Sequence, residues 1–317
     1  MGRPFRFGVQ LSKLDSTQWA EELRTIEDLG FSSVFVPDHF SNQWDPTALL
    51  GAASAVTENL RVGTLVYDVD FRHPVVFAKQ AATIQLLSGG RHEFGIGAGW
   101  MESDYVQAGI SYDRPGLRIE RLEEAIQIVK SLWSQDATSF EGRHYHVSDV
   151  PAAAHGIQKV DPPKILIGGG GRRLLHLAGR HADIVGINPQ LHEGKVTADT
   201  PADLAPARVR EKVEWVRAGA EAAGRDPATI EFNSLSFVVA VTDDPQGLRA
   251  GIAQNSGMTV EQVADCPLFL TGSPAEICER LEKRREETGI SYVVIQGRKR
   301  RDLEPFAEAV VSTLAGK

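Results

Sequence analysis

The sequence predicts a (β/α)8 TIM barrel, with insertion segments at the carboxyl-terminal face of its strands. Short apolar runs alternate with amphipathic segments along the 317 residues, and eight of the runs read as strands. Strands separated by helices pair in parallel, and eight parallel strands close a barrel. An open doubly wound sheet would carry a glycine fingerprint after its first strand, where this chain has Gln10-Leu11-Ser12-Lys13-Leu14-Asp15. We therefore expect one barrel domain over residues 1–317.

Each expected strand is a short run of apolar or β-favouring residues bounded by turn formers. In chain order the strands are expected at residues 5–11, 34–36, 60–66, 93–97, 164–167, 183–187, 230–241 and 292–296. The expected helices follow from apolar positions at helical spacing and lie at residues 16–30, 45–58, 73–87, 117–133, 172–180, 207–224, 274–289 and 303–314. Asp15 or Ser16 is expected to cap the first helix, and Gly30 to end it.

Three polar stretches interrupt the repeat and are expected to be insertions: residues 135–163, 188–206 and 242–271. The first contains Phe140-Glu141-Gly142-Arg143-His144-Tyr145-His146-Val147, which is typical of a small hairpin. Substrate specificity is expected to reside in these segments, because they follow strand ends.

Composition and charge exclude several classes of partner. The net charge is -8 and the pI is near 5.6, so the chain offers no broad attraction to nucleic acid or to anionic membranes. No apolar run is long enough to span a bilayer, and the first residues lack a signal-peptide pattern, so a cytoplasmic location is expected. Cys266 and Cys278 lack the spacing of a zinc or redox motif and are expected to be reduced structural thiols.

The strand at 34–36 runs through Pro37 into Asp38 and His39. Functional residues of such barrels gather where strands end and the next loops begin. An imidazole that a neighbouring carboxylate orients can exchange a proton near neutral pH, which favours a general acid or base over a satisfied core histidine. Trp44 either walls the same pocket or anchors the loop.

Four consecutive glycines, Gly168, Gly169, Gly170 and Gly171, separate the strand at 164–167 from the helix after it. Uncovered backbone amides at this junction, together with the helix dipole, favour an anion such as a phosphate. The alternative interpretation is a flexible turn with tight helix–strand packing. No P-loop lysine follows the glycines, so NTP hydrolysis is not expected.

Other strand ends carry weaker signals. Gly95-x-Gly97-x-Gly99-Trp100 permits a flat ligand to approach the backbone, although glycine in a barrel strand also relieves crowding. The basic run from Arg298 to Arg301 is either a solvated face or a contact for an anionic ligand. His144 and His146 lack accompanying carboxylates or cysteines, so no metal site is expected.

Several segments together resemble the luciferase-like monooxygenase superfamily, in the right order and over nearly the whole chain. They are Pro37-Asp38-His39-Phe40, Gly63-Thr64, Phe71-Arg72-His73-Pro74, Leu87-Ser88-Gly89-Gly90-Arg91, Gly95-Ile96-Gly97-Ala98-Gly99-Trp100, Phe140-Glu141-Gly142 and Gly168 to Gly171. Within the superfamily the sequence is most similar to the branch that uses the deazaflavin coenzyme F420. The resemblance implies an oxidoreductase that transfers a hydride between the deazaflavin and a small organic substrate.

The resemblance also implies cofactor-binding residues. A cis peptide bond behind the flavin ring is expected at Leu65-Val66, after Thr64. Three further positions match residues that line the ring or its tail: Ala98, Gly99 and Ser103. Gly170 and Gly171, next to Gly169, match phosphate-binding amides, in agreement with the independent interpretation of the glycine run.

By the same resemblance, Asp38 and His39 match an acid–histidine pair near the reactive carbon, and Trp44 matches an active-site tryptophan. His39 would then be the proton donor or acceptor that accompanies hydride transfer. The sugar-phosphate dehydrogenases of this branch place a catalytic glutamate where this chain has Trp100. The full set of lysines that bind the substrate phosphate in those enzymes is not evident either, although Lys195 and Arg298 lie in comparable regions. Glucose 6-phosphate is therefore not the expected substrate.

Two other functions are weighed against this one. The first is an FMNH2-dependent two-component monooxygenase, which receives reduced FMN from a separate reductase and uses molecular oxygen. Deazaflavin does not activate oxygen as a flavin does, so the two reaction types are distinct. The second is a non-catalytic barrel that keeps cofactor binding, which the intact Asp38-His39 pair disfavours. The resemblance further favours a homodimer.

Overall fold

The computed structural model describes residues 2–191, 194–297 and 300–317. Within these ranges, eight parallel strands form the barrel: β1 Arg6–Leu11, β2 Ser33–Val36, β3 Arg61–Thr64, β5 His92–Gly97, β8 Lys164–Gly169, β9 Ile184–Ile187, β10 Glu231–Ser236 and β13 Ile290–Gly297. Each strand pairs with the next in this order, and the pairing of β1 with β13 closes the ring. The predicted (β/α)8 TIM barrel is confirmed.

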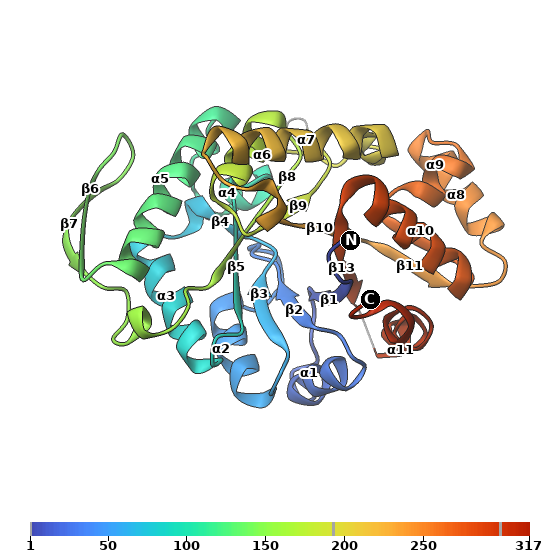
Figure 1. Ribbon diagram of the computed structural model, residues 1–317, viewed down its shortest axis with the longest axis horizontal. Helices are drawn as coiled ribbons and strands as arrows, with labels where there is room; N and C mark the ends of the chain where they lie inside the picture. Colours follow the sequence, from blue (N-terminus) through green and yellow to red (C-terminus); the bar gives the residue numbers. More distant parts are fainter. Residues whose placement is uncertain (1, 192–193, 298–299) are drawn as a thin grey trace.

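Helices surround the strands, as Figure 1 shows. They include α1 Trp19–Asp28, α2 Pro46–Val56, α3 Pro74–Leu87, α5 Pro115–Ser134, α6 Arg172–His181, α7 Pro206–Ala222 and α10 Pro274–Thr288. The chain closes with α11 Arg300–Phe306, a π-helical stretch Ala307–Val311 and α12 Ser312–Leu314. These bounds agree with the expected helices to within a few residues at most ends.

The start of α1 differs from the expectation. The helix begins at Trp19, after Gln18, and neither Asp15 nor Ser16 caps it. The Asp15 carboxylate instead accepts hydrogen bonds from the backbone and side chain of Thr17, which closes a local turn. The expected end is correct, because Gly30 follows the helix with a φ of +82°, a conformation that glycine adopts without steric cost.

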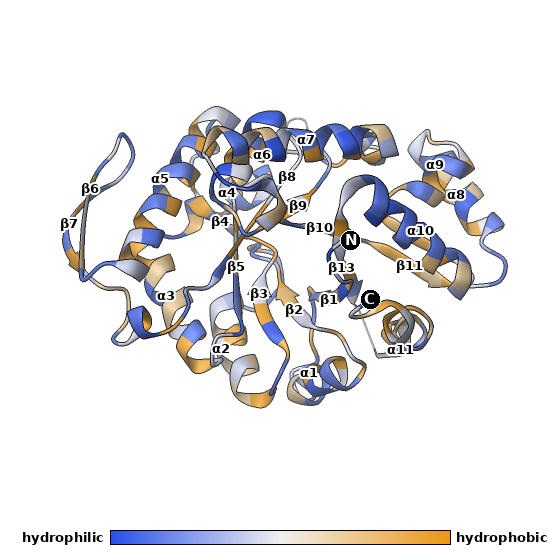
Figure 2. Cartoon of the chain, viewed as in Figure 1, coloured by the Kyte–Doolittle hydropathy of each residue, from blue (hydrophilic) through white to orange (hydrophobic). Residues whose placement is uncertain are grey.

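The apolar core lies mainly between the barrel and its helices, and hydrophobic stretches such as β2 are orange in Figure 2. A smaller cluster fills the barrel itself: Phe35, Leu65, Leu166, Ile184, Tyr292 and Val294. Burying one large apolar side chain contributes about 1.5–3 kcal/mol. The barrel interior is therefore a packed core, and ligands are confined to its ends.

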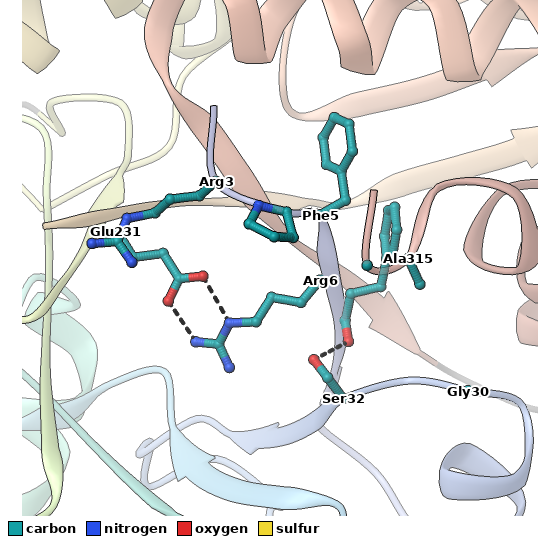
Figure 3. A pocket seen from close by; sticks show the side chains of 10 residues that line it. Arg3, Phe5, Arg6, Gly30, Ser32, Glu231 and Ala315 are labelled. Carbon is teal, nitrogen blue, oxygen red and sulfur yellow. Dashed lines mark hydrogen bonds and ion pairs between the residues drawn. The ribbon is translucent and has the colours of Figure 1, made fainter. Parts of the chain in front are cut away.

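Charged side chains occupy the amino-terminal end of the barrel. Glu93, which is 1% exposed, accepts from Arg6 at 2.8 Å, from Arg61 at 2.6 Å and from the Tyr292 hydroxyl at 2.9 Å. Burial acts to raise the pKa of Glu93, but the two guanidinium groups outweigh it and hold that pKa below its usual value. Arg6 also binds Glu231 through two hydrogen bonds of 2.7 Å, drawn in Figure 3 beside a cavity of about 410 Å³.

The seventh expected strand, residues 230–241, is not continuous, and this prediction is wrong. β10 leaves the barrel after Ser236, whose hydroxyl donates to the Pro267 carbonyl. Phe237 is 47% exposed and separates β10 from β11 Val238–Val241, which pairs in parallel with β12 Phe269–Gly272 outside the barrel. Between β11 and β12 lie α8 Gln246–Ser256 and α9 Val260–Asp265.

The first insertion contains the expected hairpin, formed by β6 Ala137–Glu141 and β7 His146–Pro151, which extends from one side of the barrel in Figure 1. The two ends of the chain meet beside β13. The Phe5 amide donates to the Lys317 carbonyl, and the Gly316 amide donates to the Phe5 carbonyl. No helix in the described ranges is both long and apolar enough to cross a lipid bilayer.

Candidate active site

His39 lies in the loop after β2, with its side chain 20% exposed. Its Nδ1 is 2.6 Å from Oδ2 of Asp104, a buried residue of the short helix α4 Glu102–Ala108. The edge of the imidazole meets the Trp100 ring, with centroids 5.7 Å apart and planes at 88°. No hydrogen-bond partner among the described residues reaches Nε2. The carboxylate therefore fixes one ring nitrogen and leaves the other available for proton exchange.

Asp38 does not orient His39, which corrects the expectation from their adjacency. Its carboxylate accepts two hydrogen bonds from Arg72, at 2.6 and 3.0 Å, and a third from the Asp68 backbone amide. Adjacent residues at a strand end point in different directions. Asp38 thus links the end of β2 to β4 Tyr67–Asp68 and to Arg72 beyond it, whereas Asp104 of α4 binds His39.

The peptide bond between Leu65 and Val66 is cis, as expected from the resemblance. Two buried side chains hold this bulge: the Gln10 amide donates to the Leu65 carbonyl at 2.7 Å, and the Thr64 hydroxyl donates to the Gly95 carbonyl at 2.7 Å. Val66 projects toward β5 and β8, because a Cβ at Gly97 would lie 2.8 Å from one of its methyl groups. The glycines of these strands make room for the bulge.

The other predicted site residues follow β5. Ala98 is 8% exposed, Gly99 has a φ of +68°, and Ser103 is exposed on the first turn of α4. Trp44 is 39% exposed, whereas Trp100 is the aromatic residue in ring contact with His39. The structure therefore brings Trp100 into contact with His39, with Ala98 and Gly99 directly before it in the chain, and leaves Trp44 partly exposed just before α2.

The glycine run is a built junction between β8 and α6. A Cβ at Gly170 would lie 2.3 Å from the Pro189 backbone, so only glycine fits there, and Gly171 is the residue before the first turn of α6. The Gly170 carbonyl accepts from Nζ of Lys212 at 2.5 Å, and Asp203 pairs with the same Nζ at 2.7 Å. Burial lowers the pKa of Lys212, although Asp203 opposes this effect. The loop is thereby held with its amides at the helix amino terminus.

Sequence reasoning missed three residues that shape this site: Asp104, Gln10 and Lys212. Asp104 follows Ser103 in a segment with no distinctive spacing, so its partner could not be foreseen. Gln10 is a polar residue within an apolar strand. Lys212 could have been found, because it shares the helical spacing of the buried Val209, Val213 and Val216 on α7. A lysine on such a face needs a buried acceptor.

The basic run that begins at Arg298 lies outside the part of the chain whose side chains the structure describes. Lys195 is described and is exposed. Within the described ranges, no group of three or more histidine, cysteine or acidic residues has the arrangement of a metal site.

Similar proteins were found by sequence and by structure. An F420-dependent glucose-6-phosphate dehydrogenase of Microbacterium testaceum is 34% identical over 227 residues, which are 67% of this chain and 66% of the relative. This chain thus spans just under two thirds of that relative's length. A phthiodiolone/phenolphthiodiolone dimycocerosates ketoreductase of Mycobacterium tuberculosis is 26% identical, over 86% of this chain and 79% of its own.

Among solved structures, the coenzyme F420 dependent tetrahydromethanopterin reductase from Methanopyrus kandleri has a TM-score of 0.77 at 18% identity, covering 98% of this chain and 99% of its own. This likeness supports the fold. The profile described as luciferase-like monooxygenase matches residues 10–265, most of the chain. The chain therefore belongs to the luciferase-like monooxygenase family.

Proposed function

We propose that this protein is a coenzyme F420-dependent oxidoreductase that transfers a hydride between the deazaflavin and a carbonyl or alcohol carbon of a small organic substrate. The relatives support this assignment, since the first is an F420-dependent dehydrogenase and the second a ketoreductase. The observation that carries it is the imidazole of His39, which the buried Asp104 carboxylate holds at 2.6 Å on one nitrogen. Such a group exchanges the proton that must accompany a hydride.

The residues present fit the cofactor. Val66 packs against the glycines of β5 and β8 at the carboxyl-terminal end of the barrel, where it would support one face of the flat ring. The amides before α6, together with Arg172 and Arg173 in its exposed first turn, suit a phosphate. Bound F420 would supply or take up the hydride.

The roles of the protein's own groups then follow. His39 donates a proton from Nε2 to the substrate oxygen during reduction and accepts it during oxidation. Asp104 holds the ring and stabilises its protonated form, as a buried carboxylate does for an imidazole base. Trp100 limits the approach of water and substrate to the edge of the ring.

The test is a fluorescence titration of the purified protein with oxidised F420 and, in parallel, with FMN. We expect F420 binding in the micromolar range or tighter and FMN binding at least about tenfold weaker. Tight FMN binding with negligible F420 binding would contradict the proposal and favour a two-component monooxygenase served by a separate reductase.

We also propose, from the family resemblance, that the protein is a cytoplasmic homodimer. Sedimentation of the purified chain measures its mass directly. A single species with the mass of one chain across the accessible concentration range would contradict the dimer.

A further inference from the structure

Asp68 is a buried carboxyl at the end of β4, two residues beyond the cis peptide bond. It is 7% exposed. Its Oδ1 accepts from the Tyr105 hydroxyl at 2.8 Å and from the Asp70 amide at 3.0 Å. No described residue donates a hydrogen bond to its Oδ2. This oxygen is not fully buried, so it retains contact with solvent.

The charged groups around Asp68 are carboxylates and the basic side chains that pair with them. Asp38 from the β2 loop accepts the Asp68 amide, and Asp70 shares the Tyr105 hydroxyl from α4. Each nearby aspartate except Asp68 has a basic partner: Asp38 has Arg72, Asp70 has Arg121 and Asp104 has His39. Among the residues whose side chains the structure describes, no cation or imidazole pairs with Asp68.

An ionised carboxylate in this position would be buried among like charges without a counterion, which is energetically unfavourable. Burial raises the pKa of Asp68 to about 7, and the carboxylates of Asp70 and Asp38 add to the rise against the hydrogen bonds from Tyr105 and the Asp70 amide. Burial also raises the pKa of Tyr105, so its hydroxyl keeps the proton that it donates to Oδ1.

The free oxygen of Asp68 adjoins Gly99, which lies just after β5. A Cβ at Gly99 would lie 2.3 Å from Oδ2 and 2.0 Å from the Tyr105 hydroxyl oxygen, so Gly99 packs directly on this carboxyl group. Gly99 and Ala98 are the residues that the resemblance assigns to the lining of the cofactor ring. The solvent-accessible oxygen therefore lies beside Gly99, at the end of the barrel where His39 and Val66 also follow their strands.

We propose that Asp68 is a neutral carboxylic acid that donates a hydrogen bond from Oδ2 to a carbonyl oxygen or ring nitrogen of the bound heterocycle. The ligand in this inference rests on the proposed function, whereas the protonation of Asp68 does not. A carboxylate only accepts hydrogen bonds, but a carboxylic acid kept neutral by its site can donate one. A donor to the ring strengthens as the ring gains electrons, so Asp68 favours the reduced cofactor over the oxidised one.

The first test needs no cofactor. The protonated carboxyl of Asp68 should give an infrared C=O band that disappears in Asp68→Asn and titrates in the wild-type protein with a midpoint of about 7. Asp70→Asn removes a neighbouring negative charge and should move this midpoint to lower pH. Asp244→Asn, at an exposed aspartate, should leave band and midpoint unchanged. A wild-type carboxyl that is already ionised at about pH 5, as for an ordinary aspartate, overturns the inference.

The second test measures binding of oxidised and reduced F420. The wild-type affinity for reduced F420 should fall above neutral pH, because Asp68 then loses the proton that it donates. Asn keeps a hydrogen-bond donor that does not titrate, so Asp68→Asn should bind within about threefold of wild type and lose this pH dependence. Asp68→Leu fills similar space without a donor and should bind reduced F420 about tenfold more weakly, with a smaller loss for oxidised F420. Equal binding by Asp68→Leu and wild type would overturn the inference.

The two proposals fail in different ways. If the wild-type protein binds no F420 but the titrating carboxyl band is present, the proposed function is wrong and the neutral acid stands. If F420 binds tightly while Asp68 is ionised below neutral pH, the proposed function stands and this inference is wrong.

Discussion

The two ends of the barrel use the same types of side chain for opposite purposes. At the amino-terminal end, Glu93 accepts from Arg6, Arg61 and Tyr292 in one closed network. At the carboxyl-terminal end, His39 and Asp68 each use one polar atom within the protein, and the other atom has no partner among the residues that the structure describes. A network whose atoms are all paired contributes to stability and specificity of the fold. Polar atoms left unpaired at the rim are those available to a ligand.

The origin of the paired groups explains this difference. Glu93, Arg6 and Arg61 belong to barrel strands, so the sheet register places them together. The partners of His39 and Asp38 come from loops and from the short helix α4. Loop residues can be replaced without altering the register of the barrel, which is why this end carries the chemistry in such folds.

His39→Ala should have the largest effect and break only the carboxyl-terminal end. Loss of the proton donor should slow turnover by about 10³-fold, within the usual range for general acid–base groups. Steady-state kinetics measures the turnover and F420 titration measures the cofactor affinity. The affinity should stay within about threefold, because the residues expected to hold the cofactor ring follow β3 and β5 and do not include His39. Turnover that stays close to wild type would remove His39 from proton transfer.

Glu93→Gln should break the amino-terminal end instead. The amide removes the negative charge that Arg6 and Arg61 share. Arg6 keeps Glu231 and both guanidinium groups are partly exposed, so the free energy of unfolding should fall by about 2–3 kcal/mol, less than for a fully buried unpaired charge. Urea denaturation measures the loss. Glu231→Gln is the control, with a smaller loss because its carboxylate is 14% exposed and Arg6 keeps Glu93. If Glu93→Gln instead left the free energy of unfolding unchanged and slowed the turnover of the folded enzyme, the division of roles between the two ends would be contradicted.

Asp104→Asn should slow turnover by about 10²-fold without a comparable loss of stability or cofactor affinity. The amide fits the space of the carboxylate but cannot hold a protonated imidazole by charge. The kcat and KM should separate, with the loss in kcat, and Asp104→Glu should restore part of it. Asp113→Asn, which alters a half-exposed partner of Arg121, is the matched control and should leave turnover within about twofold. A loss in KM alone would argue against the positioning of His39.

His92→Gln should have the smallest effect, at the weak point of the amino-terminal end. The imidazole of His92 is fully buried, its Nδ1 lies 2.9 Å from the Val62 carbonyl, and its Nε2 has no hydrogen-bond partner within the described ranges. Burial lowers the pKa of His92 from 6.5 to about 4. Below about pH 6.5 the unfolded chain therefore binds a proton at His92 that the folded chain does not bind. The contribution of the neutral imidazole to the free energy of unfolding is fully present above that pH and is lost as the pH falls toward 4.

At pH 5 the free energy of unfolding is lower by about 2 kcal/mol for this reason, and His92→Gln should not show that loss. Urea denaturation at pH 7 and pH 5 measures the difference, which should shrink by that amount in His92→Gln. His155→Gln, at an exposed histidine, should change nothing. An unchanged pH dependence in His92→Gln would assign the acid sensitivity to other groups.

The periodicity of the sequence was sufficient to predict the barrel, because each strand and helix carries its own apolar pattern. The failure at residues 230–241 shows the limit of that signal. Both β10 and β11 are runs of β-favouring residues, and only the contacts of Ser236 and Phe237 with the Pro267–Leu268 segment separate them. Such long-range contacts are not written in local composition.

The candidate site was predictable to the level of strand ends but not of partners. The resemblance gave the position of the cis peptide bond at Leu65-Val66, and the glycine run was located by its composition. The partner of His39 was not foreseen, because Asp104 is 65 residues away in the chain and its segment carries no distinctive motif. Adjacency in sequence suggested Asp38, whose carboxylate the structure assigns to Arg72.

The meeting of the chain ends beside β13 has a practical consequence for engineering. Phe5 and Lys317 are already hydrogen-bonded, so a short peptide could join the ends without distorting the barrel. New ends could then be opened at the exposed residues Asp243 and Asp244, between β11 and α8 outside the barrel. A circular permutant of this kind would keep the order of strands around the barrel and all of the residues that border the active site.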